Sequence, residues 1–255
     1  MKNYQNIKDD WEFNILGIYN FNKPGGLTKY FNFIKKNHKK IKGDLLEAGV
    51  FKGSSLISTA IFLKKIKCPK KIYAFDSWAG FPKKYKEHSK DDKRNWNILF
   101  EKKKILKEHF KKIQINYKYL KFLKNTKLNS FNVSTSNNFT SCSIKDLKKK
   151  IKFLQLDNII LIKGNFEKTM RSSNKINKIF CALIDVDLYS SYKITLPYTW
   201  NLLSKNGMIF LDEYYSLKFP GARIACDEFI KEKNIRPYCL SKKKGDFERW
   251  CIFKK

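Results

Sequence analysis

Acidic residues stand at the ends of several apolar runs of this chain. In such positions their carboxylates are able to bind a cation, a sugar hydroxyl or a metal ion. Glu47 ends the first such run, and Gly49, Gly53, Ser54 and Ser55 follow it ahead of an apolar helix. A strand that passes through a glycine turn into a helix brings backbone close to a nucleotide-like ligand. The dinucleotide fingerprint Gly-x-Gly-x-x-Gly is absent. A carboxylate here would repel a diphosphate but suits a cation such as the amino or sulfonium group of S-adenosylmethionine.

Further acids end the next apolar runs: Asp76, Asp185 with Asp187, and Asp212 with Glu213. In an open α/β sheet the ligand crevice lies at the carboxyl ends of the strands, so these side chains should converge. An acid after the second strand is able to accept both hydroxyls of a ribose. Asp185, Asp212 and Glu213 offer hard oxygen ligands of the kind that suits magnesium. Structural alternatives are that Asp187 caps the following helix and that Glu213 is solvated.

Strand and helix patterns alternate along most of the chain. Near-continuous apolar strands separated by helices predict a parallel sheet covered on both faces. Two short closing segments, 238–240 and 250–253, predict an antiparallel hairpin at its edge. The other strands after Glu47 are predicted at 71–77, 158–164, 178–186 and 207–213, and the helices at 56–66, 144–156, 191–204 and 222–233.

Residues 83–140 interrupt this alternation. They contain a basic amphipathic stretch, 96–123, and a polar tract, 125–140. Long interruptions of compact domains are usually lids or binding loops, so we expect a helical, lid-like insertion, with oligomer contacts or mere decoration as alternatives. Residues 1–42 are expected to form an N-terminal cover segment, with core packing as the alternative, and 43–255 the main domain.

The formal net charge of +31 raises the question of a polyanionic partner. Five of the 54 basic residues are arginine, whereas phosphate recognition draws on arginine's planar fork. We therefore expect solvated lysines, weak attraction to acidic partners or membranes, and no specific nucleic acid. The six cysteines form no Cys-x-x-Cys pair, and neither a signal core nor a membrane-length apolar run is present. These features predict a cytoplasmic protein with reduced thiols and no transmembrane segment.

Five motifs in order carry a family resemblance. They are EAGVFKG at 47–53, FDSWAGFP at 75–82, KGNFEKT at 163–169, IDVDLY at 184–189 and LDEY at 211–214. The chain resembles macrocin O-methyltransferase-like (TylF-type) enzymes over residues 43–81 and from 143 onward. These are class I, magnesium-requiring methyltransferases that use S-adenosylmethionine, and characterised members methylate sugar hydroxyls on antibiotics. The resemblance implies an α/β Rossmann-like fold with a mostly parallel seven-stranded sheet.

The resemblance also implies roles for individual residues. Asp76 would bind ribose, and Asp185 would be both a metal ligand and, as a hypothesis, the proton acceptor. The chain departs from the family at Glu213, which replaces the usual aspartate, and at Asn165, where an aromatic residue is common. The implied cofactor residues are Glu47, Gly49, Gly53, Ser54 and Ser55 around the methionine end, Asp76 and Ser77, Gly164, Asn165 and Phe166 around the adenine, and Asp185; the implied metal ligands are Asp185, Asp212 and Glu213.

The expected function is therefore Mg²⁺-dependent O-methylation of a hydroxyl on a sugar, or on a glycosylated or secondary metabolite. The expected partners are S-adenosylmethionine, a small-molecule or glycan acceptor and, through the amphipathic insertion, a second copy of the chain. One alternative is an RNA or other polyanion methyltransferase, which the charge favours. Another is a catalytically silent scaffold for glycan assembly.

Overall fold

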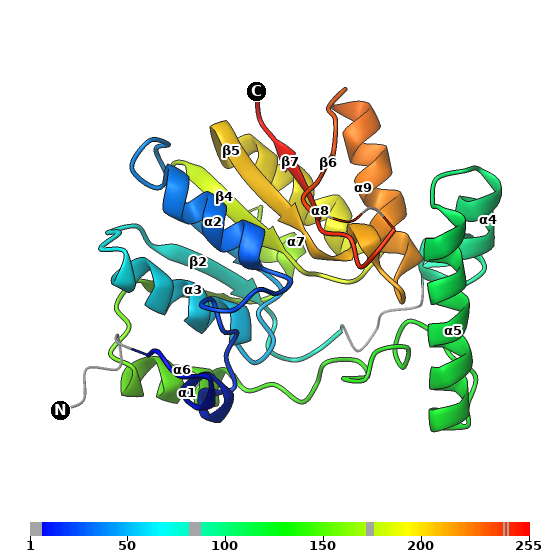
Figure 1. The fold of residues 1–255 in the computed structure, drawn as a ribbon, viewed down its shortest axis with the longest axis horizontal. Helices are drawn as coiled ribbons and strands as arrows, with labels where there is room; N and C mark the ends of the chain where they lie inside the picture. Colours follow the sequence, from blue (N-terminus) through cyan, green and yellow to red (C-terminus); the bar gives the residue numbers. More distant parts are fainter. Residues whose placement is uncertain (1–6, 82–87, 172–175, 242, 244) are drawn as a thin grey trace.

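The computed structural model describes residues 7–81, 88–171, 176–241, 243 and 245–255. A seven-stranded sheet in the order β3-β2-β1-β4-β5-β7-β6 forms its centre (Figure 1). The first five strands run parallel, and β7 is antiparallel to both β5 and β6. The strands are β1 Asp44–Ala48, β2 Ile72–Asp76, β3 Ile159–Lys163, β4 Ile179–Ile184, β5 Leu203–Leu211, β6 Tyr238–Cys239 and β7 Trp250–Phe253.

This topology confirms the predicted mostly parallel sheet and the antiparallel pair at its edge. Within the pair, β7 lies next to β5, and β6 forms the outer edge. The order reverses between β1 and β4, because β2 and β3 extend the sheet on one side and β5 on the other. A ligand crevice is expected at that switch point, beyond the carboxyl ends of the strands.

Helices cover both faces of the sheet (Figure 1). One face carries α3 Ser54–Lys65, whose residues 56–63 are all buried, as expected for a helix apolar on every side. The helices α1 Asp10–Leu16, α2 Thr28–Asn37 and α6 Ile144–Phe153 share that side, and α7 Phe166–Thr169, α8 Tyr189–Leu202 and α9 Pro220–Glu232 lie on the other.

Both ends of β5 differ from the sequence prediction. The helix predicted to reach residue 204 ends at Leu202, because Leu203 already pairs with Ile179 as the start of β5. The strand predicted to reach Glu213 ends at Leu211, and Asp212–Tyr215 form a 3₁₀ turn, η3. This turn carries Glu213 off the sheet and toward the end of β4.

The N-terminal segment belongs to the main core. Phe13, Tyr30, Phe31 and Ile34 are buried in the same apolar cluster as residues of β1 and α3. Tyr19 connects to α3 because its carbonyl accepts a hydrogen bond of 2.7 Å from the Ser58 hydroxyl. Among the described residues before β1, none lines the cavity described below. The segment therefore covers a face of the sheet, and residues 1–6 lie outside the described part.

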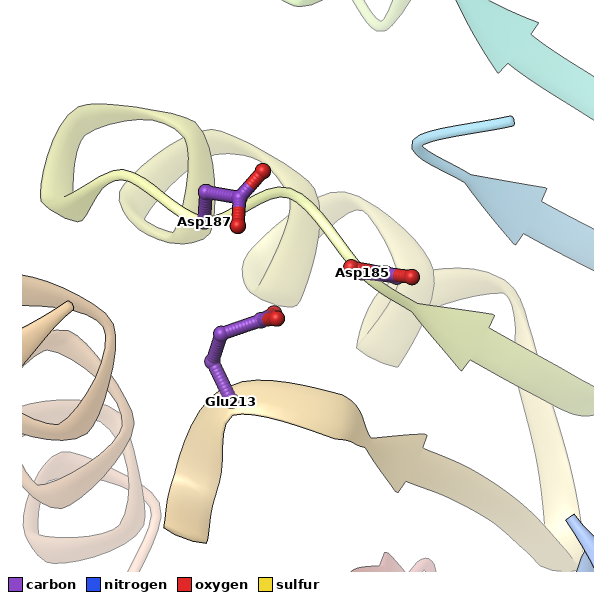
Figure 2. Close-up of side chains that lie close together, drawn as sticks. All are labelled: Asp185, Asp187 and Glu213. Carbon is purple, nitrogen blue, oxygen red and sulfur yellow. The ribbon is translucent and has the colours of Figure 1, made fainter. Parts of the chain in front are cut away.

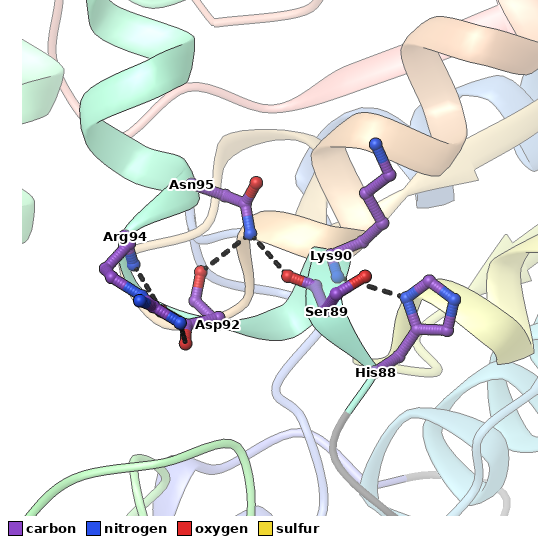
Figure 3. Close-up of polar contacts among 6 residues, drawn as sticks. All are labelled: His88, Ser89, Lys90, Asp92, Arg94 and Asn95. Carbon is purple, nitrogen blue, oxygen red and sulfur yellow. Dashed lines mark hydrogen bonds and ion pairs between the residues drawn. The ribbon is translucent and has the colours of Figure 1, made fainter.

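The insertion folds into helices α4 Asn95–Glu101 and α5 Lys107–Lys124 beside α9 (Figure 1). Its entry, the short turn η2 Ser89–Asp91, is followed by polar residues that satisfy local backbone groups (Figure 3). The Asn95 amide donates to the carbonyls of Ser89 and Asp92, at 2.7 and 3.0 Å. The Arg94 guanidinium hydrogen-bonds the Asp92 carboxylate and lowers its pKa. Residues 82–87 of the predicted motif and insertion lie outside the described residues.

Candidate active site

A cavity of about 460 Å³ lies at the carboxyl ends of the parallel strands. Most of the implied cofactor residues line it: Gly49, Ser54, Ser55, Asp76, Ser77, Gly164, Asn165, Phe166 and Asp185. These residues come from the ends of β1, β2, β3 and β4, and of the acids predicted to converge there Asp76, Asp185 and Asp187 line the cavity. Glu47, Gly53, Asp212 and Glu213 are not among the lining residues.

The glycine turn after β1 requires its glycines. Gly49 has φ +84°, and a Cβ atom there would lie 1.6 Å from the Asp185 carbonyl oxygen. Gly53 has φ +82° at the N-cap of α3, where a Cβ would lie 2.5 Å from Leu147. No L-residue fits either position without moving its neighbours. The turn therefore lets β1 and β4 approach closely and leaves the N-terminus of α3 beside the cavity.

Asp76 holds this turn in place. Its Oδ2 accepts hydrogen bonds from the Val50 and Phe51 N–H groups at 2.7 and 2.8 Å. Its Oδ1 accepts a third, from the Trp78 N–H, at 2.7 Å. A carboxylate has about four acceptor positions, so one remains for a ligand in the cavity. The predicted ribose acid is thus also the residue that joins β2 to the glycine turn.

Glu47 occupies a different place from the one its implied role suggests. The side chain is fully buried, and Oε1 accepts a 2.6 Å hydrogen bond from the Ser55 hydroxyl, while Ser55 itself lines the cavity. No partner for Oε2 is present among the described residues. Burial is the main cause that raises the pKa of Glu47, to about 8. Glu47 therefore meets the cavity through Ser55 and does not form its wall.

The turn after β3 contributes the opposite wall. Gly164 donates its N–H to the Asp76 carbonyl at 2.9 Å, which ties this turn to the end of β2. The Asn165 side chain caps α7 by accepting from the Glu167 N–H at 3.0 Å. Asn165 thus has a structural role where the family commonly has an aromatic residue, and Phe166 supplies an aromatic side chain to the cavity.

A cluster of three carboxylates lies at the ends of β4 and β5 (Figure 2). One oxygen each of Asp185, Asp187 and Glu213 lies within 4.8 Å of the other two. The buried Tyr192 hydroxyl orients Glu213, because it lies 3.1 Å from Oε2 and 3.3 Å from the Glu213 N–H. Asp185 and Asp187 also line the cavity, so the cluster opens toward a bound ligand.

Burial and mutual repulsion raise the pKa values of these groups. Burial, followed by the charges of Asp212 and Asp187, raises the pKa of Asp185 well above its usual range. Burial raises the pKa of Asp187 to about 7, against the opposing charge of Lys218. The pKa of Glu213 is also raised well above its usual range, first by burial and then by Asp185. Three negative charges in such a space require a nearby cation.

The cluster differs from the implied metal ligands in one member. Asp212 was expected beside Asp185 and Glu213, but its Oδ1 lies 3.6 Å from Arg249 Nη1 in an ion pair. Asp187 takes its place because a tight turn, closed by a 2.6 Å hydrogen bond from the Leu188 N–H to the Val186 carbonyl, directs its side chain to the cluster. Asp187 therefore does not cap α8: Asp91 of the insertion accepts the Tyr189 N–H instead, at 3.0 Å.

Sequence reasoning missed two residues in the segment that returns from α5 to α6. Phe139, near the end of the insertion, and Cys142, just after it, line the wall beside Phe51 and Phe81. The ring centroids of Phe139 lie 5.3 Å from Phe51 and 5.2 Å from Phe81. No local pattern marks these residues, because the polar tract around them resembles an ordinary loop. Their position supports the expected covering role for the end of the insertion.

Solved methyltransferase structures share this fold. The O-methyltransferase NovP has a TM-score of 0.62 at 17% identity, over 89% of this chain and 80% of its own. CalS11, a calicheamicin methyltransferase, has a TM-score of 0.60 at 15% identity, over 96% and 80%. An O-methyltransferase from Bacillus cereus, in complex with SAH, has a TM-score of 0.51 at 9% identity, over 98% and 93%. At these identities the likeness establishes the fold.

The sequence itself establishes the family. The search of curated protein sequences found no match to the chain. Separately, none of the described helices is long and apolar enough to cross a bilayer. The profile of the family described as Macrocin-O-methyltransferase (TylF) matches residues 29–134 and 132–241, which is most of the chain. The chain therefore belongs to the macrocin-O-methyltransferase (TylF) family and is an S-adenosylmethionine-dependent O-methyltransferase.

Proposed function

We propose that this enzyme transfers the methyl group of S-adenosylmethionine to a hydroxyl of a sugar, or of a glycosylated or secondary metabolite, with the help of Mg²⁺. The observation that carries the proposal is the pairing of two features at one cavity. The glycine turn, Asp76 and the turn after β3 form one part of its wall, and Asp185 and Asp187 form another. A methyl donor and an acceptor hydroxyl need this arrangement side by side.

The donor site is assigned as follows. Gly49, Ser54 and Ser55 would receive the methionine end at the N-terminus of α3, with the buried Glu47 orienting the Ser55 hydroxyl from behind. Asp76 would accept a ribose hydroxyl at its remaining position, with Ser77 beside it. Gly164, Asn165 and Phe166 would flank the adenine, Phe166 offering its ring face.

The carboxylate cluster fits a magnesium ion. Mg²⁺ prefers oxygen ligands and is usually held by few carboxylates, with water or substrate completing its shell. Asp185, Asp187 and Glu213 supply three such oxygens, all within 4.8 Å of one another. We assign the ion to these three residues, with the predicted ligand Asp212 next to them on η3.

Each group then has a defined task. The sulfonium methyl is already activated, so the protein must hold the acceptor oxygen in line behind it. A bound Mg²⁺ would lower the pKa of that hydroxyl and orient it. Asp185 lines the cavity and is proposed to take the hydroxyl proton, since a base must be within hydrogen-bond reach of it. Phe139 and Cys142, from the segment that returns from α5 to α6, would help to exclude water.

A sugar acceptor is supported by the chemistry of the relatives. CalS11 is described as a TDP-rhamnose 3'-O-methyltransferase. A nucleotide-linked deoxysugar is therefore the first acceptor to test.

The test combines transfer and binding. Purified enzyme, labelled S-adenosylmethionine, Mg²⁺ and a panel of nucleotide sugars and glycosides should give a methylated sugar, and excess EDTA should abolish the reaction. Full activity in EDTA would remove the metal from the mechanism. Methyl incorporation into RNA but into no member of the panel would contradict the sugar assignment. Calorimetry of S-adenosylmethionine binding, which requires no acceptor, tests the donor site separately.

A further inference from the structure

One face of α5 is attached to the methyltransferase domain. Its side chains bond three successive carbonyls that follow η3: His109 Nε2 lies 2.7 Å from the Ser216 oxygen, the Asn116 amide donates to Leu217 at 3.1 Å, and the Tyr117 hydroxyl donates to Lys218 at 2.8 Å. Ile113 and Leu120 are buried on the same side. The rotation of α5 about its own axis is therefore set, and the direction of its other face with it.

The other face of α5 exposes a row of large apolar side chains. Ile115 is 68% exposed, Tyr119 59%, Phe122 83% and Leu123 56%. Residues 115, 119 and 122 are spaced as neighbours on one side of a helix. We call these four residues the outer stripe. Figure 1 shows α5 at the margin of the molecule, on the side away from α1 and α6.

Lysines surround the outer stripe. Residues 102–127 contain ten lysines and one glutamate, Glu108. Lys111, Lys118 and Lys121 are all exposed on α5, and Lys111 and Lys118 lie four residues before and three after Ile115. A helix that carries aromatic and aliphatic side chains within a basic surface is typical of helices that lie in the interface of an anionic membrane.

We propose that the outer stripe of α5 docks the enzyme on an anionic lipid surface. Phe122, Tyr119 and Ile115 enter the headgroup region, and the lysines around them contact acidic headgroups. Charge complementarity favours this occupant, because a second copy of the chain would bring another +31 charges to a face that is itself basic. The attachment of α5 to the segment after η3 holds the cavity at a set orientation to the membrane.

Vesicle binding by the full-length protein tests the proposal. Sedimentation with phosphatidylcholine vesicles containing about 30% phosphatidylglycerol should retain the wild type, whereas pure phosphatidylcholine should bind it at least about tenfold more weakly. Phe122→Ser, and separately the double variant Ile115→Ser with Tyr119→Ser, should each lower binding about tenfold. Ile15→Ser is the matched control, because Ile15 is 76% exposed on α1 and should leave binding unchanged.

A second pair of variants separates local from overall charge. Lys111, Lys118 and Lys121 changed together to Gln should weaken vesicle binding strongly and reduce its salt dependence. The same change at Lys35, Lys36 and Lys39, which are exposed around the end of α2, removes equal charge and should have little effect. None of these residues lines the cavity, so S-adenosylmethionine binding by calorimetry confirms that each variant is folded.

Three outcomes would overturn the proposal. The first is that the wild type fails to bind acidic vesicles, or that both stripe variants bind them as the wild type does. The second is a stable dimer in analytical ultracentrifugation that Phe122→Ser dissociates, which would assign the face to a second copy. The third is RNA binding that depends on Phe122 without any vesicle binding.

Discussion

At the scale of single residues, the site combines crowded carboxylates with backbone strain, and a bound cation would relieve the repulsion between the carboxylates. Two buried carboxylate residues, Asp187 and Glu213, and the half-buried Asp185 share a small space, and Asp187 holds a backbone conformation with φ +56° that few non-glycine residues adopt. Strain and unpaired charge of this kind persist only where the surrounding structure enforces them. Here the enforcing contacts are the tight turn at Asp187 and the Tyr192 hydroxyl at Glu213.

Exchange of single acids tests which residues bind the metal. Asp187→Asn should lower Mg²⁺ affinity at least about 100-fold, because it removes a ligand from the group of three, whereas Asp212→Asn should change it far less. Calorimetric titration of Mg²⁺ measures both without an acceptor. A larger loss of Mg²⁺ affinity in Asp212→Asn than in Asp187→Asn would identify Asp212 as a ligand. It would also show that the ion pair between Asp212 and Arg249 opens when the metal binds.

Gly49 and Gly245 have the same φ angle, so a comparison of their alanine variants distinguishes backbone strain from a steric clash. Gly49→Ala should destabilise the fold by more than about 3 kcal/mol and abolish S-adenosylmethionine binding, since its Cβ would overlap the Asp185 carbonyl. Gly245 also has φ +84°, but its Cβ would meet nothing within 4 Å. Gly245→Ala should therefore cost only about 1 kcal/mol in urea unfolding. Equal losses would refute the close approach of β1 and β4.

Glu47 should make stability depend on pH in an unusual direction. Its pKa is raised to about 8 when folded, so between its ordinary value and pH 8 the folded protein keeps a proton that the unfolded chain releases. The free energy of unfolding should fall as pH rises through this window, by at most about 5 kcal/mol, and then level off. Glu47→Gln should abolish that fall. Urea unfolding of both proteins at pH 5 and pH 8.5 checks this prediction. It would be contradicted if Glu47→Gln were no more stable relative to the wild type at pH 8.5 than at pH 5.

At the scale of elements, α5 supports the segment that follows η3. The carbonyls of Ser216, Leu217 and Lys218 all accept hydrogen bonds from α5. His109 also stacks on Tyr215 of η3, with ring centroids 3.8 Å apart. The chain is therefore attached at two places: α5 is joined to the segment after η3, and Phe139 and Cys142 of the returning segment line the cavity, while a lid role for the insertion stays a prediction.

Removing His109 should loosen this support. Burial lowers the pKa of His109 to about 4 in the folded protein, whereas its ordinary value is about 6.5. The unfolded chain therefore gains a proton first as the pH falls from 6.5 toward 4, and the stability that the neutral ring contributes above pH 6.5 is lost over this range. His109→Ala should cost about 2–3 kcal/mol at pH 7, and less at pH 5. His109→Gln retains a donor for the Ser216 carbonyl and should be intermediate. Full stability of the alanine variant in urea unfolding would show that α5 does not depend on this contact.

At the scale of the whole molecule, the fold gathers four acids of a strongly basic chain at the end of two neighbouring strands. Those acids, Asp185, Asp187, Asp212 and Glu213, are far apart in sequence from the lysine-rich insertion that packs beside them. Positive charge also reaches these acids, because Arg249 forms an ion pair with Asp212 and Lys218 opposes the rise in the pKa of Asp187. The expected second copy of the chain and the cytoplasmic location stay predictions.

Mg²⁺ should stabilise the whole domain. The folded state presents the carboxylates together and the unfolded chain does not, so Mg²⁺ at about 100 times its dissociation constant should add about 2.7 kcal/mol and raise Tm by about 5 °C or more. Asp185→Asn should remove most of this increase, and EDTA should reverse it without loss of helical circular dichroism. An unchanged Tm for the wild type would contradict a metal site in the cluster.

The sequence by itself determined the fold class, the family and the end of the sheet at which the cavity lies. Those conclusions depend on local signals: apolar strands that end in acids, a glycine turn before a helix, and five motifs in a set order. Only the tertiary structure decided that Asp187 joins Asp185 and Glu213, that Glu47 lies behind Ser55, and that α5 supports the segment after η3. Each of these depends on where separate segments meet; His109 and the Ser216 carbonyl, for example, are 107 positions apart in the chain. Residue types and their local spacing are enough to predict where a strand ends. Which side chains meet across a hundred positions of sequence depends on how the helices and strands pack, and no local pattern encodes that.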